Sequence, residues 1–158
     1  MRGLILLNSF ACVTPRPGLT LARAALAVVP WSIAQRCRGL VLRYVTANAV
    51  SSANLEPFER AVAQVEREDY CRRLSLLARF DVRRRLSEIG CPVLVLASDA
   101  DRLLPSVREG RRMVSALRHG TLAVLPGSGH ACLADPRVDL EARLVAWLRS
   151  GRAVETGG

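Results

Sequence analysis

Residues 92–130 read PVLVLASDADRLLPSVREGRRMVSALRHGTLAVLPGSGH, and this stretch decides the fold. Residues 92–97 (PVLVLA) contain an unbroken run of valine and leucine, as expected of a strand buried on both faces. Residues 105–118 place apolar side chains at helical spacing with arginines between them, and residues 122–125 are a second apolar run. A strand, a helix and a strand joined by short connections predict a right-handed parallel unit of the α/β class.

The sequence on either side of this unit is mostly helical. A further short apolar strand is predicted at residues 3–7, where Leu4 to Leu7 are all leucine or isoleucine. Helical patterns occupy residues 19–45 (broken at Pro30), 55–80, 81–89 and 138–148, the last with Trp147 inside. We therefore divide the chain into a core strand (1–9), a helical segment (10–80), an α/β part (81–150) and a disordered tail (151–158).

The first residues allow a second interpretation. Arg2 followed by an apolar run to Val13 imitates the start of a signal peptide. The run at residues 4–7 fits a buried parallel strand at least as well, and we favour the strand.

Composition excludes several classes of function. The formal charge is +9 and every basic residue is arginine, but the arginines are scattered and aromatic residues make up only 4% of the chain, which argues against nucleic-acid binding. No apolar run reaches the roughly 20 residues that a membrane-spanning helix needs. The five cysteines form no CxxC pair and no Cys/His cluster, which argues against zinc, and no other metal or cofactor is implied. An odd number of cysteines without regular spacing indicates free thiols, as expected in the cytoplasm or an organelle interior.

Two polar loops follow the two predicted strands of the α/β part. Asp101 follows the first strand and His130 follows the second. Reactive side chains in parallel sheets collect after the carboxyl ends of strands, so this carboxylate and imidazole should lie side by side. A carboxylate in that place holds the histidine tautomer that a general base needs. We interpret Asp99 as a solvated turn residue and His119 as a surface residue.

These residues resemble the closing signature of the α/β-hydrolase fold. Asp101 with Pro105 matches D-x-x-x-P, and residues 127–130 match G-x-G-H, in the order acid before histidine. Ser98 stands where the family usually has glycine. The helical segment resembles the cap that the family inserts over its active site, so the resemblance covers nearly the whole chain. Within the family, the pattern looks closest to the phytyl ester synthase and diacylglycerol acyltransferase type.

The resemblance implies a serine nucleophile in a G-x-S-x-G elbow, and this motif does not occur in the 158 residues. We expect the elbow in an upstream segment, so that this chain alone would be inactive. Cys132 lies too close to His130 in one loop to be a convincing nucleophile, and the spacing of His130 and Asp135 is interpreted as chance.

Two hypotheses about function remain. In the first, the parent protein hydrolyses or transfers acyl groups of small-molecule, lipid-like esters through a Ser-Asp-His triad that includes Asp101 and His130. In the second, the chain is an inactive binding module. The exposed edge of the strand at residues 3–7 would then pair with the missing N-terminal half or with another chain.

Overall fold

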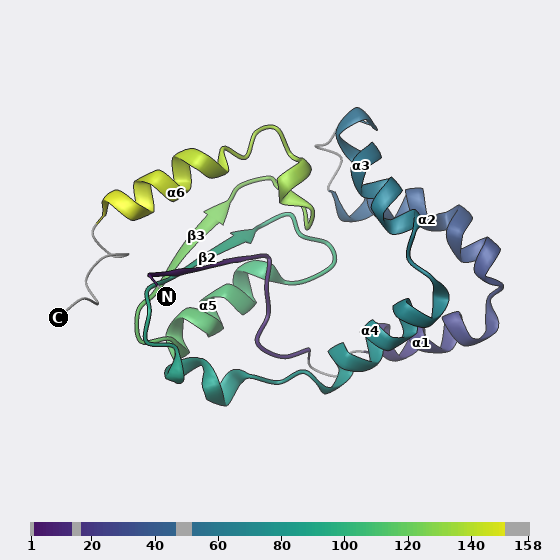
Figure 1. Cartoon of the computed structure of the whole chain (residues 1–158), viewed down its shortest axis with the longest axis horizontal. Coiled ribbons are helices and arrows are strands. Elements are labelled where there is room, and N and C mark those ends of the chain that lie inside the picture. The colour runs from purple at the N-terminus through teal and green to yellow at the C-terminus, as the bar shows by residue number, and fades with distance from the viewer. Residues whose placement is uncertain (1, 14–16, 47–51, 151–158) are drawn as a thin grey trace.

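The computed structural model describes residues 2–13, 17–46 and 52–150, and its centre is a parallel sheet (Figure 1). The strands β1 (Leu4–Leu7), β2 (Val93–Ser98) and β3 (Gly120–Leu125) lie in the order β1-β2-β3. Leu4 pairs with Val93, and Val93 pairs with Gly120. All three predicted strands are therefore present, and the N-terminal apolar run is a strand of the sheet.

Helices cover both faces of this sheet. Helix α5 (Ser106–Ala116) packs on one face and α6 (Leu140–Arg149) on the other (Figure 1). Successive side chains of β2 alternate between the two layers: Val93 and Val95 contact the α5 layer, whereas Leu94 and Leu96 contact the α6 layer. Each buried valine or leucine contributes about 1.5–3 kcal/mol. Burial on both faces explains why β2 is apolar without interruption from Val93 to Ala97.

Four helices form an arm beside the sheet (Figure 1). This helical arm consists of α1 (Pro17–Val28), α2 (Trp31–Val45), α3 (Ser52–Ala63) and α4 (Arg67–Arg79), and a 3-10 helix η1 (Arg83–Glu88) leads from it back to β2. The predicted break at Pro30 is present. The guanidinium of Arg67 donates to the carbonyls of Leu26 and Ala27, so a positive charge binds the carboxyl end of α1.

The prediction of one helix over residues 55–80 was wrong, because α3 and α4 are separate. The chain turns after Ala63, and Glu66 is extended with φ −78° and ψ 158°. No glycine or proline marks this break. The new helix instead starts with Glu68 and Asp69 in its first turn, where negative charge favours a helix N-terminus. The short helix predicted at residues 81–89 is the 3-10 helix η1.

The arm leaves and rejoins the core at neighbouring points. The amide of Val82 donates to the carbonyl of Ala11 at 2.8 Å, and Phe10 meets Phe80 edge to face at 5.8 Å between ring centroids. Farther along, the guanidinium of Arg102 lies 5.3 Å from the ring centroid of Tyr44, at the end of α2. The arm is thus held where its two ends join the core and also beside the loop that follows β2.

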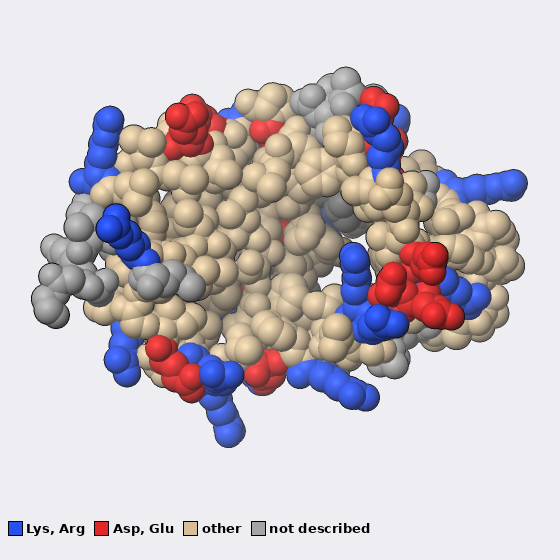
Figure 2. Space-filling model, viewed as in Figure 1, with Lys and Arg blue, Asp and Glu red and all other residues tan. Residues whose placement is uncertain are grey.

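On the face drawn in Figure 2, charged residues are scattered along the rim and over the helical arm, with arginines next to acidic residues. This distribution agrees with the interpretation of the arginines as solvated helix faces. None of the helices in the described residues is long and apolar enough to cross a membrane. The predicted disordered tail, residues 151–158, lies outside the described residues.

Candidate active site

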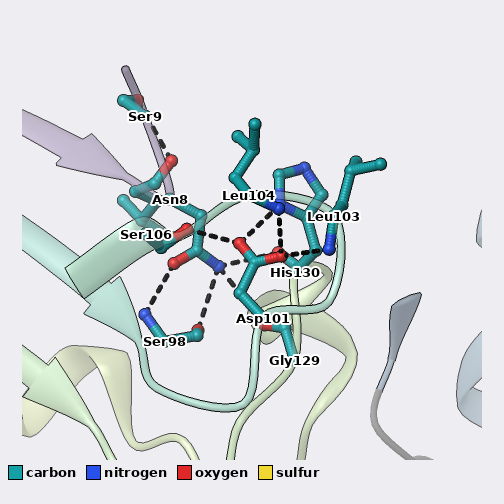
Figure 3. A network of polar contacts seen from close by, with 10 residues as sticks. Asn8, Ser9, Ser98, Asp101, Leu103, Leu104, Ser106, Gly129 and His130 are labelled. Carbon is teal, nitrogen blue, oxygen red and sulfur yellow. Dashed lines mark hydrogen bonds and ion pairs between the residues drawn. The ribbon is translucent and has the colours of Figure 1, made fainter. Parts of the chain in front are cut away.

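Asp101 and His130 are brought together at the carboxyl ends of β2 and β3. Asp101 lies in the loop between β2 and α5, and His130 lies in the loop after β3. Asp101 Oδ2 and His130 Nδ1 are 2.9 Å apart (Figure 3). The two strands are hydrogen-bonded neighbours, so residues 29 positions apart in the sequence meet at one edge of the sheet.

The carboxylate of Asp101 is fully buried and held on both oxygens. Oδ1 accepts the amides of Leu103 at 2.8 Å and Leu104 at 2.9 Å, and Oδ2 also accepts the hydroxyl of Ser106. The exposed fraction of its side chain is 0%. Burial raises the pKa of Asp101, but the hydrogen bonds from His130, Ser106 and Leu104 outweigh it and hold the pKa below its ordinary value. Asp101 is therefore a fixed anion at neutral pH.

His130 is partly open to solvent, with 30% of its side chain exposed. Because Nδ1 faces an ionised carboxylate, the neutral ring carries its proton on Nδ1. Nε2 then carries an unprotonated lone pair and lies on the side of the ring away from Asp101 (Figure 3). A ring held in this tautomer can accept a proton at Nε2, as a general base must.

Asn8 also belongs to this site, although it was not among the residues predicted from the sequence. It follows β1 directly and is 6% exposed. Its Nδ2 donates to the carbonyls of His130 at 2.8 Å and Gly129 at 3.3 Å and to Ser98 Oγ at 3.0 Å, while its Oδ1 accepts the amide of Ser98 at 2.7 Å. The sequence feature that could have identified Asn8 is its position, as a polar residue at the carboxyl end of an apolar strand.

The competing acids and the second histidine are placed elsewhere. Asp99 is exposed and accepts the amide of Gly127 at 2.6 Å. Asp135 is buried, and Arg137 binds both of its carboxylate oxygens at 2.9 and 2.8 Å. His119 is exposed. None of these residues takes the place of Asp101 or His130.

No nucleophile is apparent among the described residues. The hydroxyl of Ser106 donates to Asp101, and that of Ser9 donates to the carbonyl of Leu7. Cys132 is buried, and this burial raises the pKa of its thiol, which disfavours the reactive thiolate. Within the described ranges there is also no group of three or more histidine, cysteine, aspartate or glutamate side chains that could hold a metal ion.

Comparison with known proteins gives short sequence matches. The sequence matches no protein-family model. It is 37% identical over 70 residues to the RutD protein of Pseudomonas syringae, which carries the name of a carbamate hydrolase, covering 44% of this chain and 27% of that protein. The RutD protein of Agrobacterium fabrum is 42% identical over 60 residues, covering 38% of this chain and 23% of that protein. The matched segments thus span about a quarter of these relatives.

Solved structures resemble the chain over nearly its whole length. An esterase from Exiguobacterium antarcticum superposes with a TM-score of 0.78 at 16% identity, covering 94% of this chain and 57% of the esterase. A bromoperoxidase from Bacillus anthracis gives 0.76 at 12% identity, with 93% and 58% covered, and MenH from S. aureus gives 0.75 at 12% identity, with 95% and 59% covered. The chain spans a little over half of these structures, and at such identities the likeness establishes the fold alone.

Proposed function

Since the chain has the fold of the C-terminal part of an α/β-hydrolase, we propose that Asp101 and His130 are the acid and the base of a hydrolase active site. The observation that carries the proposal is the 2.9 Å contact between Asp101 Oδ2 and His130 Nδ1 at the carboxyl ends of neighbouring parallel strands. A buried, fully hydrogen-bonded carboxylate on one ring nitrogen leaves the other nitrogen to act on a nucleophile.

In this proposal His130 acts first as a base and then as an acid, in each half of the reaction. Nε2 takes the proton of a serine hydroxyl as its oxygen attacks the acyl carbonyl, and the ring becomes an imidazolium that the charge of Asp101 stabilises. The same proton then passes to the leaving oxygen or nitrogen as the bond to the carbonyl carbon breaks. A water molecule, deprotonated by Nε2 of His130, then attacks the acyl carbon. The bond from that carbon to the serine oxygen breaks, the imidazolium returns its proton to that oxygen, and the acid leaves with the serine restored.

The nucleophile and the oxyanion hole come from outside these 158 residues in this account. No G-x-S-x-G occurs in the sequence, and two serines of this network already have partners: Ser98 is bound to Asn8, and the hydroxyl of Ser106 donates to Asp101. Without a nucleophile and an oxyanion hole, the dyad has no group to activate and no means to stabilise an oxyanion.

For the substrate, we propose a small molecule with an ester or a carbamate carbonyl. The matched sequence relatives are named for carbamates and several structural neighbours for esters, and both substrates present an acyl carbonyl to the same attack. We propose that the helical arm is the cap and that it favours an apolar, lipid-like acyl group. The composition of α1 supports this preference, because Arg23 is the only charged residue in that helix. If an alcohol takes the place of water in the second step, the same site transfers the acyl group to that alcohol and acts as an acyltransferase.

The test is ester hydrolysis by the native protein from its source, compared with variants of the same full-length product. The substrate is p-nitrophenyl butyrate. His130→Ala should lower kcat by about 10²–10⁴-fold. His119→Ala is the matched control, because His119 is exposed and is the only other histidine of these 158 residues, and it should leave kcat unchanged. Equal activity of the His130→Ala variant and the native protein would refute the proposal.

One observation favours a second function as a binding module. Among the described residues, β1 pairs only with β2, so its other edge is open, and Ile5 is 38% exposed. An open apolar edge can add a strand from a partner. If a 158-residue product copurifies with a second chain, and Ile5→Pro releases that chain, the binding module replaces the hydrolase as the better account.

A further inference from the structure

We propose that Asn8 is a positioning residue that holds His130 against Asp101. The inference deepens the proposed function and rests on it for the catalytic meaning of His130. The geometric part, that the Asn8 carboxamide fixes the place of the histidine loop, depends only on the contacts of Asn8.

The carboxamide of Asn8 joins all three strands at their carboxyl ends. Asn8 stands at the end of β1, and its backbone amide donates to Leu96 O in β2 at 2.9 Å. Its side chain exchanges two hydrogen bonds with Ser98, the last residue of β2. The same Nδ2 reaches past β2 to the carbonyls of Gly129 and His130, in the loop after β3 (Figure 3). The loop that carries His130 is thus bound to the end of β1 through one buried side chain.

The residue type fits this role better than the alternatives. The contacts require N–H donors for two carbonyls and one acceptor for an amide, and a primary amide has both. Asn8 also has φ 41°, a left-handed conformation that asparagine tolerates better than most residues other than glycine. An aspartate in the ionised form would offer the acceptor but would place negative charge beside the carbonyls of Gly129 and His130.

The link acts on the backbone of His130, one step away from its ring. The carbonyl of His130 accepts from Asn8 at 2.8 Å, while its Nδ1 contacts Asp101 at 2.9 Å, so both ends of the residue are fixed. Loss of the donor leaves partly buried carbonyls without their partner, which favours a shift of the loop. Misplacement by about 1 Å can cost a catalytic site about 10²-fold in rate.

Ser98 gives independent support. It stands where the resemblance to hydrolases leads one to expect glycine, and it is 1% exposed. Its hydroxyl and its amide both bind Asn8, so the larger residue is accommodated by the same carboxamide that reaches the histidine loop. The pair forms one buried polar unit at the end of β1 and β2.

The test follows the tautomer of His130 by NMR in the 158-residue chain. His119 is the internal reference, because it is exposed and is the only other histidine. The variant is Asn8→Gly, since glycine adopts φ 41° without strain and only the side chain is removed. Ser9→Ala is the matched control, because Ser9 is the next residue and its hydroxyl binds Leu7 O instead of the histidine loop.

In the wild type and in Ser9→Ala, the ring of His130 should show the downfield Nδ1–H proton of a bond to Asp101. In Asn8→Gly that resonance should be lost and the Nε2–H tautomer should increase, with the shifts of His119 unchanged. An unchanged His130 spectrum in Asn8→Gly would overturn the inference. Should Asn8→Gly not fold, hydrogen exchange in the wild type provides the test. The carboxamide protons of Asn8 should exchange slowly with solvent. Exchange at the rate of a free side chain would overturn the inference.

These outcomes separate the two proposals. If the wild type already lacks the Nδ1–H resonance, the dyad itself is absent and the proposed function fails. If the resonance is present and survives Asn8→Gly, only the role of Asn8 fails. In the native full-length protein, Asn8→Gly should lower kcat about 10²-fold with KM unchanged.

Discussion

Replacing Asp101 by asparagine changes one charge at the centre of the site while keeping the shape of the side chain. The carboxamide oxygen of the Asp101→Asn variant can still accept the amides of Leu103 and Leu104, which bind Asp101 Oδ1 at 2.8 and 2.9 Å. The nitrogen that replaces Oδ2 is a donor and meets His130 Nδ1, so the ring must present a lone pair there and carry its proton on Nε2. The variant therefore inverts the tautomer that the proposed base requires.

The stability cost follows from the bonds that change. Two hydrogen bonds to a charged group are altered, those from His130 and Ser106, and such bonds contribute about 1.5–3 kcal/mol each. Removing a fully buried charge offsets part of this loss, because burial disfavours the ionised form. We expect the free energy of unfolding to fall by about 1–3 kcal/mol at pH 7.

The assay has two parts, urea unfolding of the 158-residue chain and kcat of the native full-length protein. In the second part Asp101→Asn should reduce kcat about 10⁴-fold, the size expected when the aspartate that orients a catalytic histidine is lost. Asp99→Asn is the control, because Asp99 is exposed and binds Gly127 instead of His130. Full activity of Asp101→Asn, or an equal loss in Asp99→Asn, would show that the dyad is not the catalytic pair.

Three further predictions concern pH, the arm and the core. Hydrogen bonds hold the pKa of Asp101 below its ordinary value of 3.8 against the effect of burial, so its contribution to stability is complete above that value and is lost as the pH falls through the folded pKa. The free energy of unfolding by urea should therefore drop as the pH is lowered below 3.8, and by less in Asp101→Asn than in the wild type. Arg102→Ala removes the contact with Tyr44 and should speed amide exchange in α2 while changing the free energy of unfolding by at most about 1 kcal/mol; unchanged exchange would mean the contact does not hold the arm. Trp147→Ala should destabilise the chain by about 3–5 kcal/mol in urea unfolding, because Trp147 is 6% exposed and packs α6 on the sheet, and a loss below about 1 kcal/mol would argue against that packing.

Much of the α/β part could be predicted because its signals are local. The apolar run in β2 has no polar residue to interrupt it, and Asp101 and His130 follow strand ends, where topology alone brings them to one edge. The structure places these two side chains in contact. Their catalytic role stays a proposal.

The parts that escaped prediction depend on tertiary contacts. Asn8 resembled an ordinary loop residue, because its partners Ser98 and His130 lie 90 and 122 positions away in the sequence. The break after Ala63 was missed because no glycine or proline marks it, and the separate start of α4 depends on charges in its first turn. Such effects are weak in sequence patterns, since each becomes decisive only when the neighbouring element is in place.

The measurement that tests the central claim most directly is labelling of the native protein with a fluorophosphonate, followed by peptide mapping. We expect the label on a serine within a G-x-S-x-G sequence outside these 158 residues. His130→Ala should abolish labelling, and His119→Ala should leave it intact. A label on a serine of this chain, or labelling that survives His130→Ala, would contradict the account.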